Sequence, residues 1–360
     1  MNIKDEIKNE IQKYRQEIKS ERMDMSFGEV INMYKDNEII ISPEYQRAFR
    51  WDEQRQSDFI ESILLGIPFP SIFVATNSDG KWELIDGLQR ISTVLAFFGE
   101  LKNVEGKDYP KNNLKLVSGS LIKDLKDVTI DTLPLEYKLQ IKRTSCRVEI
   151  ILKESDFKMR YELFKRLNTG GEGLSRQEIR NCIFRGLDNR YNEDIIQLAK
   201  NDIFRVIVNI STADAEKMYY EELVLRYFAL KNAGTRYSQA NIQDYMDDYL
   251  KEQCESYNEN LVNKDKSLFI KIMTFLEQFK TEDLFKFGRR FFSTSIYDAI
   301  MLSLSDKGVD IDKTEFIEKV NKLKTDREFN EYVGSASSTP TNISNKVRIA
   351  KKMLFDISEN

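Results

Sequence analysis

Apolar residues recur along this chain at two spacings, one typical of helices and the other of strands. In residues 3–20, four isoleucines and one tyrosine follow one another at steps of three or four. This spacing places them in one stripe of an exposed amphipathic helix. We therefore predict an N-terminal helix that docks on the rest of the chain or on a partner.

The next hundred residues predict short helices and strands in alternation. Ser26 and Glu29 have the spacing of a capping box, which opens a short helix that runs to about Tyr34. Residues 39–41 are three isoleucines and predict a buried strand. A second helix is predicted from about Asp52, with Gly66 and the following prolines ending it.

A strand, a turn and a second strand then lead directly into a helix. Residues 71–76 and 81–85 predict the strands, and the Asn-Ser-Asp-Gly sequence between them predicts the turn. The helix is predicted over residues 88–98, directly after an Asp-Gly pair. Its apolar face is expected to hold Leu88, Ile91, Val94, Leu95 and Phe98. Its polar side chains Gln89, Arg90 and Thr93 are expected to point elsewhere.

Residues beyond this helix predict a change of architecture along the chain. Residues 99–131 are polar and predict an irregular insertion, followed by a strand at 146–152 and a helix at 156–167. Beyond Gly186 the helical pattern dominates, as at 219–230, 268–279 and 293–304. We therefore expect an α+β fold with a mostly α-helical C-terminal domain. The predicted divisions are an N-terminal helix at 1–25, an α+β domain at 26–186 and an α-helical domain at 187–360.

Composition narrows the classes of protein that this chain can belong to. Its 360 residues are 41% hydrophobic, which is ample for a packed core, and 55 basic against 59 acidic residues do not indicate nucleic-acid binding. A local basic groove remains a possible alternative, because net charge does not show how charges are arranged.

The N-terminal segment is too polar for a signal peptide and no run of 18 apolar residues occurs, so we expect a cytoplasmic protein without a membrane span. The three cysteines, Cys146, Cys182 and Cys254, are expected to be buried and reduced.

The absence of histidine excludes several kinds of active site at once. Ser-His-Asp hydrolases, His-metal nucleases and Cys/His zinc sites all require an imidazole. Chemistry in this chain must therefore use carboxylates, arginine, lysine, amides or a bound metal ion.

The Asp86-Gly-Leu-Gln-Arg90 segment is the first candidate site. The free N–H groups and the positive dipole end of the predicted helix would attract a phosphate there. Gly87 allows close approach of the backbone, Arg90 can bind phosphate oxygens, and Asp86 can hold a metal ion or orient a water. The alternative is structural: Asp86 caps the helix and pairs with Arg90.

Two further segments combine polar and aromatic residues. Tyr45-Gln46-Arg47, with Arg50 and Trp51 close by, can bind phosphate and stack on a base, although Trp51 is better explained as a core residue at a helix entry. Residues 166–181 contain a second capping box, formed by Ser175 and Glu178, and three glycines that allow bends. Helix capping leaves Arg166, Asn168 and Arg180 as polar groups without an explanation.

Four sequence blocks in this order resemble the N-terminal domain family of GmrSD-type restriction endonucleases. The blocks are YQRxFxW, FIESILxGxPxP, IDGxQR and FxRLNTGGxxLxxQEIRN, and they cover roughly residues 26–190. The resemblance implies a ParB/sulfiredoxin-like nucleotide-binding core. It also implies a role in anti-phage defence, in which NTP hydrolysis with Mg²⁺ licenses DNA cleavage by a separate nuclease.

The resemblance assigns roles to individual residues. Asp86, Gln89 and Arg90 would be catalytic, with Asp86 also holding the metal ion. The nucleotide would further contact Gln46, Arg47, Gly87, Asn168 and Arg180, the last two at the rim of the site.

Two departures from the family pattern leave more than one function open. Leu88 replaces the first glutamine of a DGQQR motif, which removes an amide that could position the nucleotide or a water. The chain also lacks the histidine of an HNH nuclease and the clustered carboxylates of a two-metal nuclease. Two hypotheses therefore remain: an NTPase that acts with a nuclease partner, and a non-catalytic module that recognises DNA or a protein.

Overall fold

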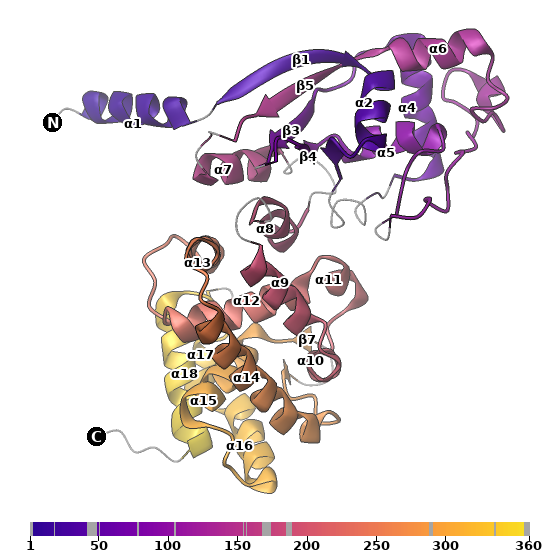
Figure 1. Ribbon diagram of the computed structural model, residues 1–360. Coiled ribbons are helices and arrows are strands. Elements are labelled where there is room, and N and C mark those ends of the chain that lie inside the picture. Colours follow the sequence, from indigo (N-terminus) through magenta and orange to yellow (C-terminus); the bar gives the residue numbers. More distant parts are fainter. Residues whose placement is uncertain are drawn as a thin grey trace. The chain divides into compact units, whose positions relative to one another are not determined.

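The computed structural model divides the chain into two compact units, residues 1–174 and residues 175–360. The structure describes residues 3–17, 19–41, 49, 51–77, 79–103, 106–153, 155, 157–167, 174–184, 189–287, 291–334 and 336–355. Gly186, where the sequence predicts a domain boundary, lies outside these residues, so the exact domain division stays a prediction. The predicted α+β class is confirmed, with a mixed sheet in the first unit and mostly helices in the second (Figure 1).

The first unit is built on a five-stranded sheet in the order β1-β5-β3-β4-β2. Its strands are β1 (Ser20–Ser26), β2 (Ile39–Ile40), β3 (Ile72–Thr76), β4 (Trp82–Asp86) and β5 (Ser145–Ile151). The β1–β5 and β3–β4 pairs are antiparallel, whereas β3–β5 and β2–β4 are parallel. This mixed pairing puts β3 and β4 between other strands and leaves β1 and β2 at the edges.

The described residues of this unit form six helices, together with a short 3₁₀ helix, η1 (Lys123–Leu125). They are α1 (Ile3–Glu17), α2 (Phe27–Lys35), α4 (Glu53–Leu65), α5 (Leu88–Phe97), α6 (Leu135–Arg143) and α7 (Phe157–Leu167). Within the unit, α4 packs against α5 and α6, and α7 packs against β4. The helix α7 of the fourth motif block therefore lies against the strand β4 of the third block.

Local sequence signals account for many of these boundaries. The Ser26 side chain accepts a hydrogen bond from the Glu29 N–H, as the capping-box spacing predicts. Asp52 caps α4, and Gly66 ends this helix in the left-handed conformation, with φ of 72°. Between β3 and β4, the Asn77 side chain accepts from the N–H groups of Asp79 and Lys81, which fixes the predicted turn.

Two elements of the first unit were not predicted. The helix expected over residues 3–20 ends at Glu17, and residues 20–26 form β1, whose sequence SERMDMS is too polar to suggest a strand. The helix α6 lies directly after the polar segment that was expected to be irregular. Both elements are stabilised by distant partners: β1 pairs with β5, and α6 packs against α2 and α4.

The helix α5 is more deeply buried than a one-sided pattern predicts. Leu88, Ile91, Val94 and Leu95 are buried as expected, but Phe97 is fully buried while Phe98 is the C-cap. Thr93 was expected to point away from the core and is instead fully buried. Its hydroxyl donates to the Gln89 carbonyl, which makes its burial tolerable.

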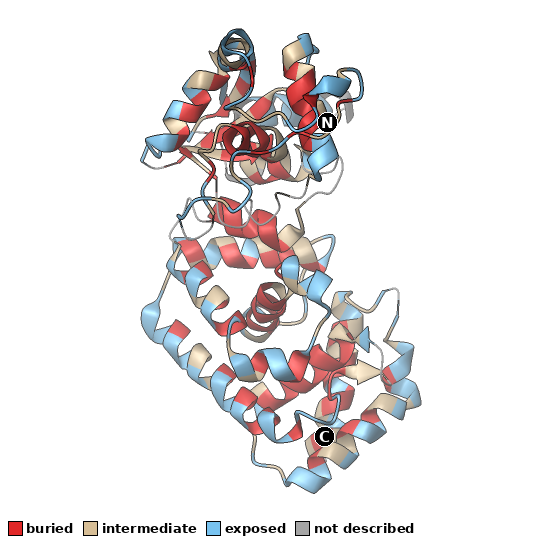
Figure 2. Ribbon diagram, turned by 90° about the vertical axis from the view of Figure 1, so that its right-hand side faces the viewer, coloured by how far each residue is buried: buried red, intermediate tan, exposed pale blue. Residues whose placement is uncertain are grey.

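The second unit consists mainly of helices, and Figure 2 shows buried residues along the helices of each unit. The helices are α8 (Arg176–Phe184), α9 (Arg190–Ala199), α10 (Asp202–Val208), α11 (Thr212–Glu216), α12 (Tyr219–Asn232), α13 (Ile242–Glu255), α14 (Glu259–Leu276), α15 (Thr294–Lys307), α16 (Lys313–Thr325), α17 (Arg327–Glu331) and α18 (Pro340–Phe355). A 3₁₀ helix, η2 (Glu277–Phe279), and a short hairpin of β6 (Lys286–Phe287) and β7 (Phe291–Phe292) complete the described elements. The helices predicted at 219–230, 268–279 and 293–304 correspond to α12, α14 with η2, and α15.

Two further predictions concern the state of the three cysteines and the absence of a membrane-spanning segment. Cys146, Cys182 and Cys254 are buried and free, as expected. Burial raises the pKa of the Cys146 thiol to about 11, which keeps it in the unreactive thiol form. In the part of the chain that the structure describes, every helix is too short or too polar to cross a membrane.

Candidate functional site

The candidate site lies at the junction of β4 and α5, where the chain turns from strand to helix. Gly87 is the N-cap of α5 and has φ of 98° and ψ of 11°. A side chain at this position would be strained by the backbone conformation, and its Cβ would come within 3.1 Å of Ile72 Cγ1. The glycine thus permits a tight turn that leaves the first N–H groups of α5 without a side-chain cap from the N-cap residue.

Arg90 fastens this turn to the beginning of β3. Its Nη2 donates to Asp86 Oδ2 at 2.7 Å, and its Nη1 donates to the carbonyl of Ser71 at 3.1 Å and to that of Pro70. Burial lowers the pKa of the Arg90 guanidinium, and the charge of Asp86 opposes this shift. A bidentate phosphate contact would require Arg90 to exchange these acceptors, so in this geometry its direct role is to position the turn.

Asp86 keeps part of its carboxylate accessible. Its side chain is 34% exposed, compared with 11% for Arg90. The structural alternative predicted that Asp86 caps α5 and pairs with Arg90. The cap is wrong, because Gly87 is the N-cap, whereas the ion pair with Arg90 is present. Its oxygens are the type of ligand that Mg²⁺ prefers.

A metal ion at Asp86 would need ligands from a bound molecule. Among the described residues, no group of three or more His, Cys, Asp or Glu side chains is placed to hold a metal ion. Mg²⁺ in nucleotide sites is commonly held by one or two carboxylates together with phosphates and waters. The single accessible carboxylate of Asp86 fits that second arrangement.

Gln89 connects this turn with the first motif block. Its Oε1 accepts a hydrogen bond from the Trp51 N–H at 3.1 Å. The buried amide of Gln56 donates to the Trp51 carbonyl at 2.6 Å. The sequence analysis did not identify Gln56 as a residue that holds Trp51 in place. A glutamine on the buried face of an amphipathic helix could have indicated such a hydrogen bond. The first bond holds the chain that follows the YQR segment against α5, and the second holds it against α4.

Trp51 is a packing residue at the entry to α4, which confirms the structural interpretation of this side chain. Its ring lies edge-on against Phe59, with ring centroids 5.8 Å apart, and Phe59 also contacts Phe27 and Phe69. Tyr45, Gln46, Arg47 and Arg50 lie outside the described residues, and so does Asn168.

Leu88, the departure from the DGQQR pattern, has a simple place in the fold. Its side chain is only 7% exposed and belongs to the buried face of α5. The leucine therefore strengthens packing at the start of this helix. In this conformation the side chain at position 88 does not line an open phosphate site.

Arg180 lies in the second unit and is engaged by neighbouring side chains. Its Nε donates to Asp247 Oδ1 at 2.5 Å, Nη1 to Gln177 Oε1 at 3.1 Å, and Nη2 to Gln243 Oε1 at 2.6 Å. Ser175 and Glu178 form the predicted capping box before it. These contacts give Arg180 a structural role in its unit, whereas its contact with a nucleotide stays a prediction.

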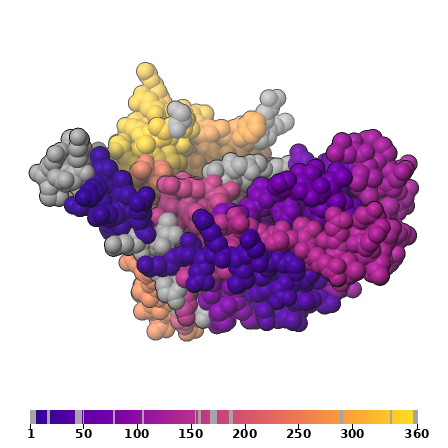
Figure 3. Space-filling view, turned by 90° about the horizontal axis from the view of Figure 1, so that it is seen from above, coloured from indigo at the N-terminus to yellow at the C-terminus, as the bar shows by residue number. Residues whose placement is uncertain are grey.

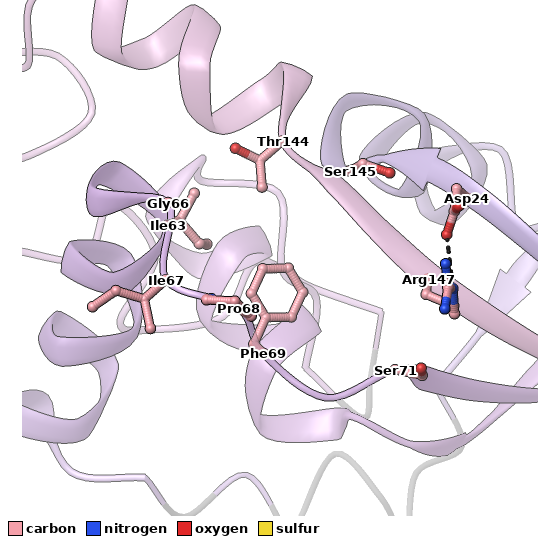
Figure 4. A pocket seen from close by; sticks show the side chains of 10 residues that line it. All are labelled: Asp24, Ile63, Gly66, Ile67, Pro68, Phe69, Ser71, Thr144, Ser145 and Arg147. Atoms are coloured by element: carbon pink, nitrogen blue, oxygen red, sulfur yellow. Dashed lines mark hydrogen bonds and ion pairs between the residues drawn. The ribbon is translucent and has the colours of Figure 1, made fainter.

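The first unit also contains a cavity that the sequence did not predict. Its volume is about 420 Å³, within the range of small-ligand pockets, and it lies where the end of α4, the start of β3 and the strands β1 and β5 meet (Figure 4). An ion pair of 3.1 Å between Asp24 and Arg147 forms part of its lining. Ser71 connects it with the candidate site, since its carbonyl accepts from Arg90. In the sequence, the feature that could have indicated this cavity is the Gly-Ile-Pro-Phe segment after α4, whose four residues line it.

Contacts within the first unit thus link described parts of all four motif blocks to the β4–α5 segment. The chain after YQR is bonded to Gln89, α4 from the second block packs against α5, and α7 from the fourth block packs against β4. The third block forms the β4–α5 turn at the centre of these contacts. Described parts of motifs that lie more than a hundred residues apart along the chain therefore contact one strand–helix segment.

Comparison with known proteins agrees with this arrangement. No curated protein matches the chain. The family model described as GmrSD restriction endonuclease, N-terminal domain, matches residues 27–185. This match confirms the resemblance carried by the four blocks and indicates a component of a restriction or defence system. Residues 27–185 of this chain are accordingly similar to the GmrSD N-terminal domain family.

Proposed function

We propose that this chain is the nucleotide-dependent component of a restriction system and that its β4–α5 turn binds the phosphates of an NTP. The observation that carries the proposal is that described parts of the four motif blocks contact the β4–α5 segment, which contains Asp86, Gly87 and Gln89. A separate nuclease would act on DNA when this chain binds or hydrolyses the nucleotide.

The proposed phosphate contacts follow from the local geometry. The open turn at Gly87 presents the N–H groups of Leu88, Gln89 and Arg90 at the positive end of the α5 dipole. The guanidinium of Arg90 adds a positive charge beside this end while it holds Asp86 in place. These groups attract an anionic phosphate without any rearrangement of Arg90.

Hydrolysis would use the accessible carboxylate of Asp86. Bound Mg²⁺ would neutralise phosphate charge and polarise the terminal phosphoryl group. Asp86 would hold the ion on the phosphates, and the backbone N–H groups would bind the oxygen atoms that gain charge as water attacks phosphorus and the bond to the leaving phosphate breaks. Asp86 is placed for this role by the hydrogen bond of its other oxygen to Arg90.

The test is Mg²⁺-dependent phosphate release from ATP, GTP, CTP and UTP, with and without DNA. Asp86→Asn keeps an oxygen that can accept from Arg90 but removes the negative charge. We expect it to lower turnover at least about a hundredfold, which is the typical loss when one group that stabilises the transition state is removed. Asp127→Asn is the matched control, because Asp127 is an exposed carboxylate of the same unit, paired with Lys115. Equal losses in both variants, or no binding of any NTP to the wild type, would overturn the proposal.

A second candidate function is a nucleotide sensor without turnover. The buried Leu88 and the commitment of Arg90 to Asp86 and two carbonyls favour it, since both reduce the polar groups that could act on a γ-phosphate. For this function we expect nucleotide binding that Asp86→Asn weakens, with no phosphate release. DNA binding with a steep salt dependence but no response to nucleotide would instead identify a DNA-recognition module.

A further inference from the structure

The N-terminal helix α1 carries apolar side chains with no packing against them. All side chains described in this helix, from Glu6 to Arg15, are exposed. Ile7, Ile11 and Tyr14 are 51%, 49% and 37% exposed. An isolated helix of this length is only marginally stable in water, so α1 needs a partner surface to bury its apolar stripe.

The spacing of the exposed residues fits one heptad of a coiled coil as well as an ordinary amphipathic helix, so the flanking charges are needed to identify the partner. Ile11 follows Ile7 by four residues and Tyr14 follows Ile11 by three. In a heptad repeat these residues occupy successive d, a and d positions, which form the seam between two helices. The flanking positions are occupied by charged residues: Lys8 and Arg15 at e, and Glu10 at g.

We propose that α1 pairs with α1 of a second copy of this chain in a parallel, two-stranded coiled coil. In a parallel pair, a residue at g faces the e residue of the next heptad on the other helix. Glu10 of one copy would therefore face Arg15 of the other copy, twice by symmetry. In an antiparallel pair, e positions face e positions and basic residues would repel each other, so the charge pattern selects the parallel arrangement.

The charges of α1 also argue against a membrane surface as its partner. Residues 3–17 contain four basic and four acidic side chains. Helices that lie on membranes are usually rich in lysine and arginine on their polar face, which anionic lipids attract. The helix α1, at the indigo end of the colour bar in Figure 3, precedes the edge strand β1 in the chain, and its side chains from Glu6 to Arg15 are exposed.

The first test compares the oligomeric state of the full chain with that of a seam variant. Sedimentation equilibrium over a range of concentrations is expected to show a monomer–dimer equilibrium. Ile11→Lys should raise the dimer dissociation constant at least about tenfold, because it places two like charges in the seam. Gln12→Lys adds the same charge at an exposed position outside the seam and should leave the constant unchanged. A wild type that stays monomeric, or equal constants for both variants, would overturn the proposal.

The second test measures the orientation of the two helices. Glu10→Arg should weaken the dimer, and the double variant Glu10→Arg/Arg15→Glu should restore it. Single cysteines at Ile7→Cys and at Tyr14→Cys should each form an intermolecular disulfide, since like positions meet in a parallel pair; the three native cysteines are buried and give little background. Crosslinking at only one of the two positions would contradict the parallel arrangement. Binding of α1 to anionic vesicles without self-association would contradict pairing itself.

Discussion

Each unit of this chain contains an arginine–aspartate pair with nearly the same shortest distance and a different environment. Arg90 and Asp86 in the first unit are 2.7 Å apart, and their side chains are 11% and 34% exposed. Arg226 and Asp298 in the second unit are 2.6 Å apart, and their side chains are 4% and 1% exposed. The distance between the charges therefore does not distinguish the two pairs, whereas access to solvent does.

The buried pair has additional partners that hold helices together. Arg226 donates two hydrogen bonds to Asp298, which joins α12 to α15, and a third to Ser338 Oγ. The pKa of Arg226 is raised, because the charge and hydrogen bonds of Asp298 outweigh the desolvation that would lower it. Lys346 of α18 lies nearby, fully buried, and donates to Ser295 Oγ and to the Ser337 carbonyl.

The comparison separates structural charges from charges that can do chemistry. A buried pair with all its hydrogen bonds made inside the protein stabilises one arrangement of helices and has no room for a ligand. A pair at a turn with one accessible carboxylate can exchange partners with a bound phosphate or cation. The largest effects on stability are therefore expected in the second unit, and the largest effects on nucleotide chemistry in the first.

Removal of one member of the buried pair should give the largest loss of stability. Arg226→Ala leaves the Asp298 carboxylate buried without its partner, which typically costs about 3–5 kcal/mol of unfolding free energy. Urea denaturation would measure the loss. Arg348→Ala is the control, since Arg348 forms an exposed pair with Glu328 and should cost less than about 1 kcal/mol. Similar losses for both variants would remove the distinction between buried and accessible pairs.

Lys346 should make the stability of the second unit depend on pH. Burial lowers its pKa in the folded chain to about 8, whereas an exposed lysine has a pKa of 10.5. Between these values the unfolded chain binds more protons than the folded chain, so this group's contribution to the unfolding free energy rises with pH, by at most about 1.4 kcal/mol per unit.

The variant Lys346→Met isolates this contribution. The difference in unfolding free energy between wild type and variant should change in favour of the wild type as pH rises from 8 to 10. Tyrosines whose pKa is raised by burial in the folded chain titrate near the upper end of this range only in the unfolded chain. They are present in both proteins and cancel in the difference. A difference that is constant with pH would show that Lys346 keeps its proton throughout.

Gly87→Ala should have an intermediate effect and should couple stability to the site. Alanine is strained at φ of 98°, and its Cβ would lie 3.1 Å from Ile72 Cγ1. We expect a loss of about 1–3 kcal/mol and weaker nucleotide binding, because the turn must open to relieve the contact. Gly80→Ala has a similar φ of 80° but open space around its Cβ, so it should lower stability less and leave binding unchanged.

Asp86→Asn should have the smallest effect on stability. The ion pair is partly exposed, so loss of its charge should cost about 1 kcal/mol or less. The same change should abolish the proposed phosphate release. A large loss of stability in this variant would show that Asp86 has a structural role like that of Asp298. It would contradict the distinction between the accessible pair and the buried pair.

Local sequence signals predicted the β4–α5 turn, and the structure shows why they were sufficient there. The Asp-Gly pair after an apolar strand specifies a left-handed residue, and the apolar spacing after it places Leu88 in the core. The capping boxes at Ser26 and Ser175 are also local, since each hydrogen bond spans three residues. Such features depend on few residues and are visible in one sequence.

The features that were missed depend on distant partners. Nothing in the polar sequence of β1 indicates a strand, because its hydrogen bonds come from β5, more than a hundred residues later. The hydrogen bonds of Arg180 were likewise missed, because the side chains that accept them, Gln243 and Asp247, belong to a different helix. The presence of a polar residue in a motif block therefore does not distinguish ligand binding from a buried network.

The most direct test of the proposed site is hydrogen–deuterium exchange with and without Mg²⁺ and each NTP. Our account predicts that a nucleotide slows exchange at the amides of Leu88, Gln89 and Arg90, in peptides that cover residues 82–97, and that Asp86→Asn reduces this protection. Protection confined to the cavity lined by Phe69 and Arg147, or to the second unit, would contradict a phosphate site at the β4–α5 turn.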